Sequence, residues 1–114
     1  MIFIVGGAYQ GKTEYAEKNW QGYHIVNRYN LVVKEQLLAG EKPVEQTAVM
    51  LEQAKLDGIF PELVIISDEL GYGLVPMDVD ARIYREINGR VNCLLAQEAD
   101  QVIRVTAGIG TRIK

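Results

Sequence analysis

Cysteine is almost absent from the sequence, since Cys93 is the only one among 114 residues. A single thiol excludes an internal disulfide and is typical of a reducing compartment, so we expect a cytoplasmic protein. Cys93 lies beside the apolar positions of a helical pattern, and we expect it to be buried by packing and unreactive.

Long apolar runs are also missing. The runs IFIV at 2–5 and LVII at 63–66 are far shorter than the roughly 20 residues that cross a bilayer. No basic region precedes the first run, so we expect neither a secretory signal nor a membrane partner. Basic side chains are not in excess either, because 12 lysines and arginines stand against 15 aspartates and glutamates, a net charge of −3. This balance argues against a nucleic-acid partner, which usually needs a basic surface.

The remaining composition is typical of a globular protein. Hydrophobic residues make up 48% and charged residues 24% of the chain, which argues against global disorder. A length of 114 residues is common for one compact domain. We therefore expect residues 1–114 to form a single domain.

Strand and helix patterns alternate along the chain. Short apolar runs predict strands at 2–5, at about 23–26, within 61–70 and at 101–108. Apolar spacing of the helical period, with glycine or proline near the ends, predicts helices at 13–20, 30–40, 43–58 and 77–100. Such alternation implies crossover connections, so we predict an α/β fold of three layers, with a mostly parallel sheet and helices on both faces. Ligands bind such a sheet at the carboxyl ends of its strands.

Two of these helices carry more detailed expectations. We expect Asn30 to cap the helix at 30–40. The helix at 77–100 is expected to turn one apolar stripe toward the core, formed by Val79, Ile83, Ile87, Val91 and Leu94 or Leu95. Gly89 in this helix costs about 1 kcal/mol relative to alanine, which indicates the close approach of another backbone.

Residues 6–13 read Gly-Gly-Ala-Tyr-Gln-Gly-Lys-Thr and follow the first expected strand. The spacing Gly6-x-x-x-x-Gly11-Lys12-Thr13 is the P-loop pattern. Glycines let backbone N–H groups converge on an anion, and the helix that follows adds the positive end of its dipole. The pattern predicts a nucleotide-phosphate site formed by Gly6, Gly7, Ala8, Tyr9, Gln10, Gly11, Lys12 and Thr13. The alternative is a tight strand-to-helix turn that binds nothing.

Lys12 and Thr13 have distinct expected roles in such a site. Lys12 reaches the β- and γ-phosphates, and the Thr13 hydroxyl can hold Mg²⁺. A carboxylate ligand is expected at the end of a neighbouring strand, where Asp68 and Glu69 follow LVIIS. We predict Lys12, Asp68 and Glu69 as catalytic residues, with Thr13 and Asp68 as metal ligands. Glu69 would serve the metal's water shell or take the acceptor proton; the alternative is a solvated acidic pair that opens the next loop.

Three further motifs accompany the loop: Glu69-Leu70-Gly71-Tyr72-Gly73-Leu74-Val75-Pro76, Gly89-Arg90-Val91-Asn92 and Gly108-Ile109-Gly110. Over residues 1–17 and 66–114 the chain resembles the bifunctional adenosylcobinamide kinase/adenosylcobinamide-phosphate guanylyltransferase family. The resemblance implies a RecA-like P-loop NTPase fold acting in cobalamin biosynthesis. ATP or GTP would phosphorylate the aminopropanol hydroxyl of adenosylcobinamide, and GMP from GTP would then be transferred to that phosphate through a histidine. A homo-oligomer is also implied, with a trimer as the form of the type enzyme.

The same resemblance suggests residues for the acceptor. Gly71 and Gly73 would let their loop close over phosphate or corrinoid; the alternative is a flexible turn. Arg90 is the best supported arginine because it lies in a family motif, although this motif can equally serve helix packing or subunit contact.

The middle of the chain departs from the family. Residues 27–62 are too short for both the family's histidine segment and its further strand with an acidic residue, and they contain no histidine. His24, the single histidine, lies in the second expected strand, where a packed or edge position is its ordinary role. Asp68 stands where the family usually has asparagine and would replace the missing acid.

We therefore predict a shortened member that keeps the kinase reaction, with Mg²⁺, ATP or GTP and a corrinoid acceptor. The guanylyltransferase step is expected to be absent or to rely on another group. The alternatives are a catalytically reduced nucleotide-binding module with a regulatory or assembly role, and a kinase for another small alcohol.

Overall fold

The computed structural model describes residues 1–70 and 79–114. Its strands are β1 (Ile2–Gly6), β2 (His24–Val26), β3 (Leu63–Asp68), β4 (Gln101–Thr106) and β5 (Ile109–Arg112). Its helices are α1 (Lys12–Asn19), α2 (Tyr29–Leu38), α3 (Pro43–Leu56) and α4 (Val79–Glu98), with a 3-10 turn at Phe60–Glu62. In the described part of the chain, no helix is both long and apolar enough to cross a membrane.

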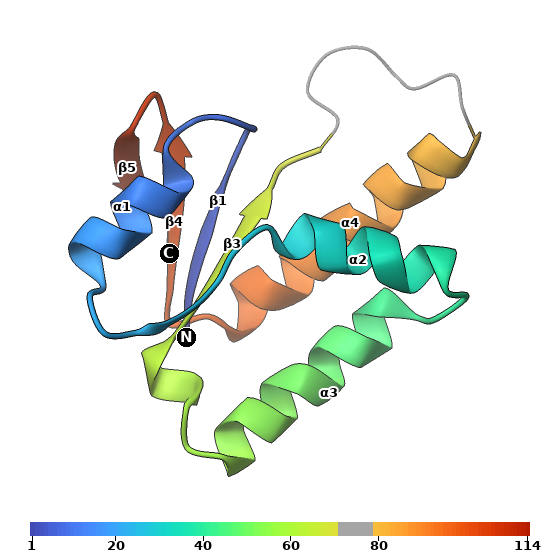
Figure 1. The fold of residues 1–114 in the computed structure, drawn as a ribbon, viewed down its shortest axis with the longest axis horizontal. Helices are drawn as coiled ribbons and strands as arrows, with labels where there is room; N and C mark the ends of the chain where they lie inside the picture. The colour runs from blue at the N-terminus through green and yellow to red at the C-terminus, as the bar shows by residue number, and fades with distance from the viewer. Residues whose placement is uncertain (71–78) are drawn as a thin grey trace.

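The five strands form one sheet in the order β2-β3-β1-β4-β5 (Figure 1). All neighbouring strands are parallel except β4 and β5. The α/β fold with a mostly parallel sheet is therefore confirmed. Gly6 and Asp68 are partners in the register of β1 and β3, so the carboxyl ends of these two strands lie side by side.

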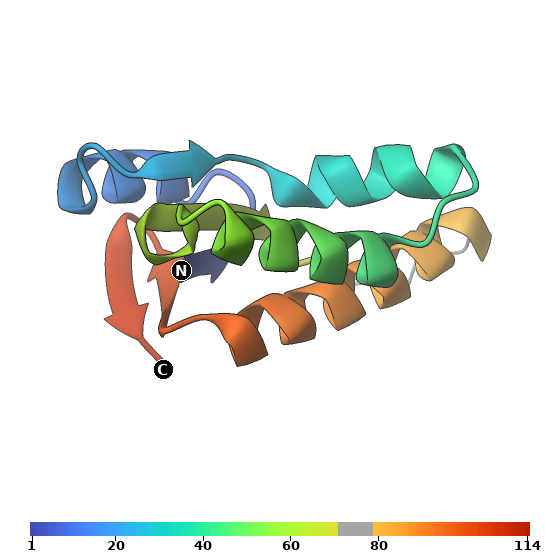
Figure 2. The ribbon, with the colours of Figure 1, turned by 90° about the horizontal axis from the view of Figure 1, so that it is seen from below.

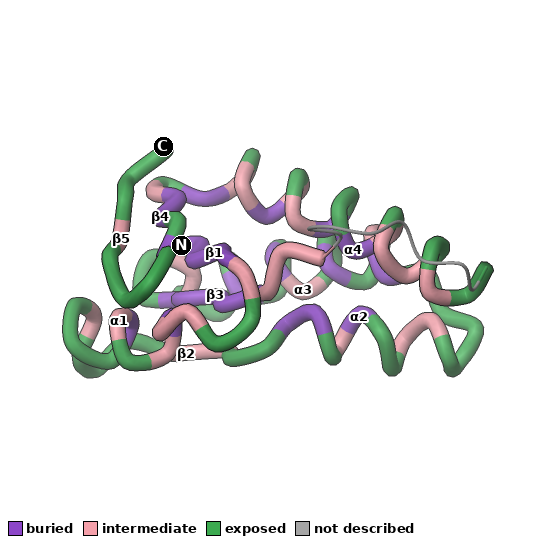
Figure 3. Tube along the Cα trace, turned by 90° about the horizontal axis from the view of Figure 1, so that it is seen from above, coloured by how far each residue is buried: buried purple, intermediate pink, exposed green. Residues whose placement is uncertain are grey.

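The two faces of the sheet carry separate cores. Phe3 and Ile65 pack with Leu95 under α2, α3 and α4, whereas Ile4 and Ile66 pack under α1. Figure 2 shows α2, α3 and α4 running side by side, and Figure 3 shows buried residues along the central strands and the inner sides of these helices. The expectation of helices on both faces is confirmed, with a single short helix on one face.

The chain after β4 differs from the prediction. Instead of one strand at 101–108, β4 ends at Thr106 and the chain returns as antiparallel β5. Ala107 (φ 51°) and Gly108 (φ 77°) form the turn, and two consecutive positive φ values are typical of a type I′ hairpin. Alanine is a poor signal for that turn, so local sequence did not reveal it.

The apolar stripe of α4 is only partly buried. Val91 and Leu95 are fully buried, whereas Val79 is 58% and Ile83 is 46% exposed. The first turns of α4 project beyond the sheet (Figure 1), so the sheet does not cover them. The stripe pattern therefore predicted the helix correctly but overestimated the length of its buried face.

Two smaller expectations for α4 are wrong. Cys93 is exposed. A Cβ atom built on Gly89 meets no other atom within 4 Å, so within the described chain no backbone approaches this glycine closely.

Candidate functional site

The phosphate-loop pattern connects β1 to α1, as predicted. Gly11 (φ 86°) stands immediately before α1, and Tyr9 also has positive φ (59°), so the loop turns through conformations that glycine adopts at least cost. A Cβ atom on Gly6 would overlap the Val105 carbonyl oxygen of β4. Glycine is therefore needed at position 6 because a side chain would not fit there. It is favoured at position 11 because the backbone has a positive φ.

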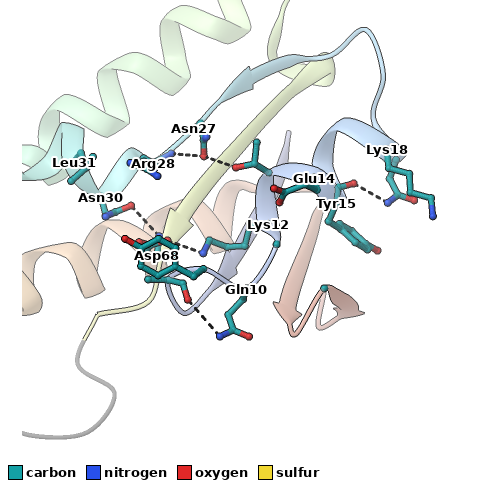
Figure 4. A pocket seen from close by; sticks show the side chains of 16 residues that line it. Gln10, Lys12, Glu14, Tyr15, Lys18, Asn27, Arg28, Asn30, Leu31 and Asp68 are labelled. Atoms are coloured by element: carbon teal, nitrogen blue, oxygen red, sulfur yellow. Dashed lines mark hydrogen bonds and ion pairs between the residues drawn. The ribbon is translucent and has the colours of Figure 1, made fainter.

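A cavity of about 820 Å³ opens beside this loop (Figure 4). Six of the predicted loop residues, 8–13, line it. The other lining residues come from α1, from the connection between β2 and α2, from the start of α2, from Asp68 at the end of β3 and from Gly108 in the hairpin turn. Gly6 and Gly7 lie at the base of the loop, outside that lining. This volume is in the range of small-molecule sites.

Lys12 and Asp68 meet in this cavity. Lys12 is only 7% exposed; its ammonium donates a hydrogen bond to the Gly7 carbonyl and lies 2.7 Å (Nζ–Oδ1) from the Asp68 carboxylate. An ammonium removed from water needs such partners, because desolvating an unpaired charge is costly. Two of the predicted catalytic residues, which lie 56 positions apart in the sequence, are thus in direct contact.

The backbone of Asp68 is held by polar side chains of two helices. Its N–H donates to Asn30 Oδ1 (3.1 Å), and its carbonyl accepts from Asn88 Nδ2 (3.2 Å). The Tyr84 hydroxyl donates to the Asn30 carbonyl (2.7 Å). Burial, together with the Asp68 charge, raises the pKa of Tyr84, so its hydroxyl keeps the proton. Asn30 therefore orients Asp68, and its predicted capping role is wrong because α2 begins at Tyr29.

Glu69 is turned away from this cavity. Its carboxylate pairs with Arg104 of β4 at 2.7 Å, and its backbone N–H donates to the Gly6 carbonyl (2.8 Å). It does not line the cavity. Its role as a supporting base stays a prediction that this geometry does not favour.

Arg90, the predicted acceptor residue that the structure describes, does not line the cavity. Arg90 projects from α4 and pairs with Glu86 at 2.7 Å, with both side chains more than 60% exposed. Asn92 of the same motif points its amide toward the Asp68 carbonyl (3.5 Å). Gly71 and Gly73 lie outside the described residues.

His24 is exposed on β2, an edge strand of the sheet, and does not line the cavity. The edge position expected for this histidine is confirmed.

Two residues that the sequence analysis did not single out line the cavity beside Thr13. Asn27 Oδ1 accepts hydrogen bonds from the Thr13 hydroxyl (3.2 Å) and from the Arg28 N–H (2.9 Å) (Figure 4). Both follow β2 at the edge of the sheet where parallel strands end, and this position is the signal by which they could have been found.

The hairpin turn supports the phosphate loop. Gln10 Oε1 accepts from the Ala107 N–H (2.7 Å), and the Gln10 carbonyl accepts from the Gly108 N–H (2.8 Å). A Cβ atom on Gly11 would lie 3.3 Å from Gly108 Cα, so loop and turn are in close contact. The Gly-Ile-Gly motif thus begins at a residue that braces the loop.

Replacing Gln10 with alanine is expected to remove one of these hydrogen bonds and loosen the loop. We expect about 1 kcal/mol weaker binding of a nucleoside triphosphate, roughly fivefold in affinity, measured by titration calorimetry. Gln46→Ala on the exposed side of α3 is the matched control and should bind as the unmodified protein does. Equal affinities for both variants would contradict a bracing role.

The residues at the cavity fit a magnesium ion held together with phosphates. Thr13 gives its hydroxyl hydrogen to Asn27, which leaves its oxygen lone pairs available, and Asp68 offers a carboxylate in the same cavity. The described residues contain no group of three or more His, Cys, Asp or Glu side chains suited to a metal. Magnesium bound with a nucleotide needs only one or two carboxylates, since phosphates and water complete its shell.

Fold and site together define a class: an α/β protein in which a P-loop pattern joins the first strand to the first helix and its lysine contacts an acid on the neighbouring strand. Residues 19–113 match the family described as "Cobinamide kinase / cobinamide phosphate guanyltransferase". The chain therefore belongs to this family, a nucleotide-binding enzyme family of cobalamin biosynthesis for which a P-loop NTPase fold is implied.

Two curated proteins illustrate the relationship. The Bifunctional adenosylcobalamin biosynthesis protein CobU of Salmonella typhimurium is 47% identical over 53 residues, and its counterpart from Escherichia coli is 45% identical over 53 residues. Each alignment covers 46% of this chain and 29% of the relative. The aligned part is therefore less than a third of either relative. The family match begins at residue 19, so the loop at 6–13 is supported by its own pattern and geometry.

Proposed function

We propose that this chain is a kinase that transfers the γ-phosphoryl group of ATP or GTP to adenosylcobinamide, with residues 1–114 acting as one nucleotide-binding domain of the RecA-like type. The observation that carries the proposal is the contact of Lys12 with Asp68 in a cavity lined by residues 8–13. Family membership supplies the acceptor class.

Each residue of the cavity has a defined task in this proposal. Backbone N–H groups of the loop bind the phosphates, and Lys12 leaves Asp68 to neutralise the β- and γ-phosphate oxygens. Thr13 and Asp68 would hold magnesium, which when bound supplies charge stabilisation to the phosphates. Catalysis then comes from positioning and fixed charges, with little demand for a strong base. That low demand fits the observation that Glu69 does not line the cavity.

We further propose that the guanylyltransferase step is absent or uses another group. The one histidine of the chain is exposed on an edge strand and does not line the cavity. A homo-oligomer, such as a trimer, and a cytoplasmic location remain parts of the proposal that follow from the family resemblance and the composition.

The test incubates the full chain with Mg²⁺, adenosylcobinamide and ATP or GTP labelled at the γ- or α-phosphate. We expect the γ-label on adenosylcobinamide and no α-label on the acceptor or the protein. Tight nucleotide binding without transfer would favour a nucleotide-binding module instead. Transfer to other alcohols alone would favour a different kinase, and an α-labelled protein would show that guanylyl transfer is retained.

A further inference from the structure

Arg28 lines the cavity, and its guanidinium has no partner among the described residues. Within residues 1–70 and 79–114 its guanidinium makes no hydrogen bond or ion pair, whereas Lys12 in the same cavity is paired with Asp68. Elsewhere in the described chain, Arg90 pairs with Glu86 and Arg104 with Glu69. Arg28 therefore carries a charge in the cavity that no group in the described part of the chain balances directly.

The backbone at Arg28 is held in an unfavourable conformation. Its φ of 51° and ψ of 52° are left-handed, which costs a residue with a side chain about 1 kcal/mol or more. The Asn27 side chain fixes this conformation, because its Oδ1 atom accepts a hydrogen bond from the Arg28 N–H. The same oxygen accepts a hydrogen bond from the Thr13 hydroxyl. Strain of this kind is often found where a side chain must be aimed at a ligand. One amide oxygen thus links the expected metal ligand to the arginine.

We infer, on the basis of the proposed function, that Arg28 is a catalytic residue that binds the γ-phosphoryl group during transfer, with Asn27 as its positioning residue. The bond between the γ-phosphorus and the β–γ bridging oxygen breaks, and a bond from the acceptor hydroxyl oxygen to that phosphorus forms. The hydroxyl proton passes to solvent water, and the nucleoside diphosphate leaves. In this inference the acceptor lies beside Arg28 and Leu31, which both line the cavity.

The chemistry of the guanidinium suits this task. Its planar fork of N–H donors matches the geometry of phosphate oxygens and can bind two of them at once. Lys12 serves the phosphates from the loop side, so a second cation from the α2 side would share the negative charge that spreads over the transferred group. A cation with an acidic partner would have to give up that partner first, and Arg28 has no acidic partner among residues 1–70 and 79–114.

The experiment measures ADP binding by titration calorimetry with Mg²⁺, with and without aluminium fluoride, which mimics the transferred phosphoryl group. The full chain should bind ADP more tightly when fluoride is present. Arg28→Ala should bind ADP alone within about threefold of the unmodified protein but lose about 100-fold in affinity for the fluoride complex. Arg28→Lys keeps the positive charge and the aliphatic part of the side chain but lacks the planar set of N–H donors. Its affinity for ADP with aluminium fluoride should fall roughly tenfold. Lys42→Ala is the matched control, because it removes an exposed cation from the turn between α2 and α3.

The outcomes separate this inference from the proposed function. Aluminium fluoride is expected to increase the affinity for ADP. If Arg28→Ala keeps this increase, or if the unmodified protein shows no increase, Arg28 does not bind the transferred group. If the gain depends on Arg28 but adenosylcobinamide is never phosphorylated, the inference stands and the proposed acceptor is wrong. A protein that binds no nucleotide at all would overturn both.

Discussion

Lys12→Ala is expected to lower the affinity for Mg-ATP and Mg-GTP by about 100-fold. The ammonium is almost fully buried at the base of the cavity, where a charged hydrogen bond to phosphate is worth about 2–3 kcal/mol. No other lysine or arginine belongs to the loop at 6–13, so the loop itself keeps no cation. Titration calorimetry with each nucleotide measures the effect.

Two controls make this result specific. Lys12→Arg keeps a positive charge and should restore part of the affinity, while Lys42→Ala should bind normally. The substitution also leaves Asp68 without its partner, but Asp68 is 23% exposed and can be hydrated, so thermal unfolding should still show a folded variant. A folded Lys12→Ala variant with unchanged affinity would mean that the loop does not bind phosphate.

Asp68→Asn is expected to reduce phosphoryl transfer by about 100-fold or more while the fold is retained. The substitution keeps the shape of the side chain and the backbone bonds to Asn30 and Asn88, but it removes the carboxylate expected to hold magnesium. It also frees Lys12 from its ion pair. In EDTA, where no metal is bound, the nucleotide affinity of the variant should therefore equal or exceed that of the unmodified protein. Adding Mg²⁺ should increase the affinity of the variant less than it increases that of the unmodified protein.

The measurement compares transfer to adenosylcobinamide across a magnesium titration with nucleotide binding in EDTA. Asp57→Asn, at the exposed end of α3, removes one carboxylate far from the cavity and should behave as the unmodified protein does. An Asp68→Asn variant with the original rate and magnesium dependence would assign the metal to another group.

Features encoded within a few residues were predictable from the sequence. The strand before the loop, the loop itself and the helix after it follow one continuous pattern, so β1, residues 6–13 and α1 could be placed in advance. The parallel sheet followed from the alternation of elements, because crossover connections leave few alternatives. The proximity of Asp68 to the loop followed in turn, since parallel strands present their carboxyl ends at one edge.

Individual hydrogen bonds between distant residues were not predictable. Asn30 fits a helix cap by local rules, but Asp68, 38 positions later, offers its N–H as the partner. The bracing of Gln10 by the hairpin turn joins residues 97 positions apart. Arg28 belongs to no motif, and only the folded cavity distinguishes it from the arginines on the surface of α4.

The most direct test of this account is a crystal structure with Mg²⁺ and a non-hydrolysable analogue of ATP or GTP. We predict the β- and γ-phosphates within hydrogen-bond distance of backbone N–H groups in residues 8–13, Lys12 Nζ on phosphate oxygens and the Lys12–Asp68 contact opened. Phosphates bound elsewhere, with Lys12 still on Asp68, would contradict it.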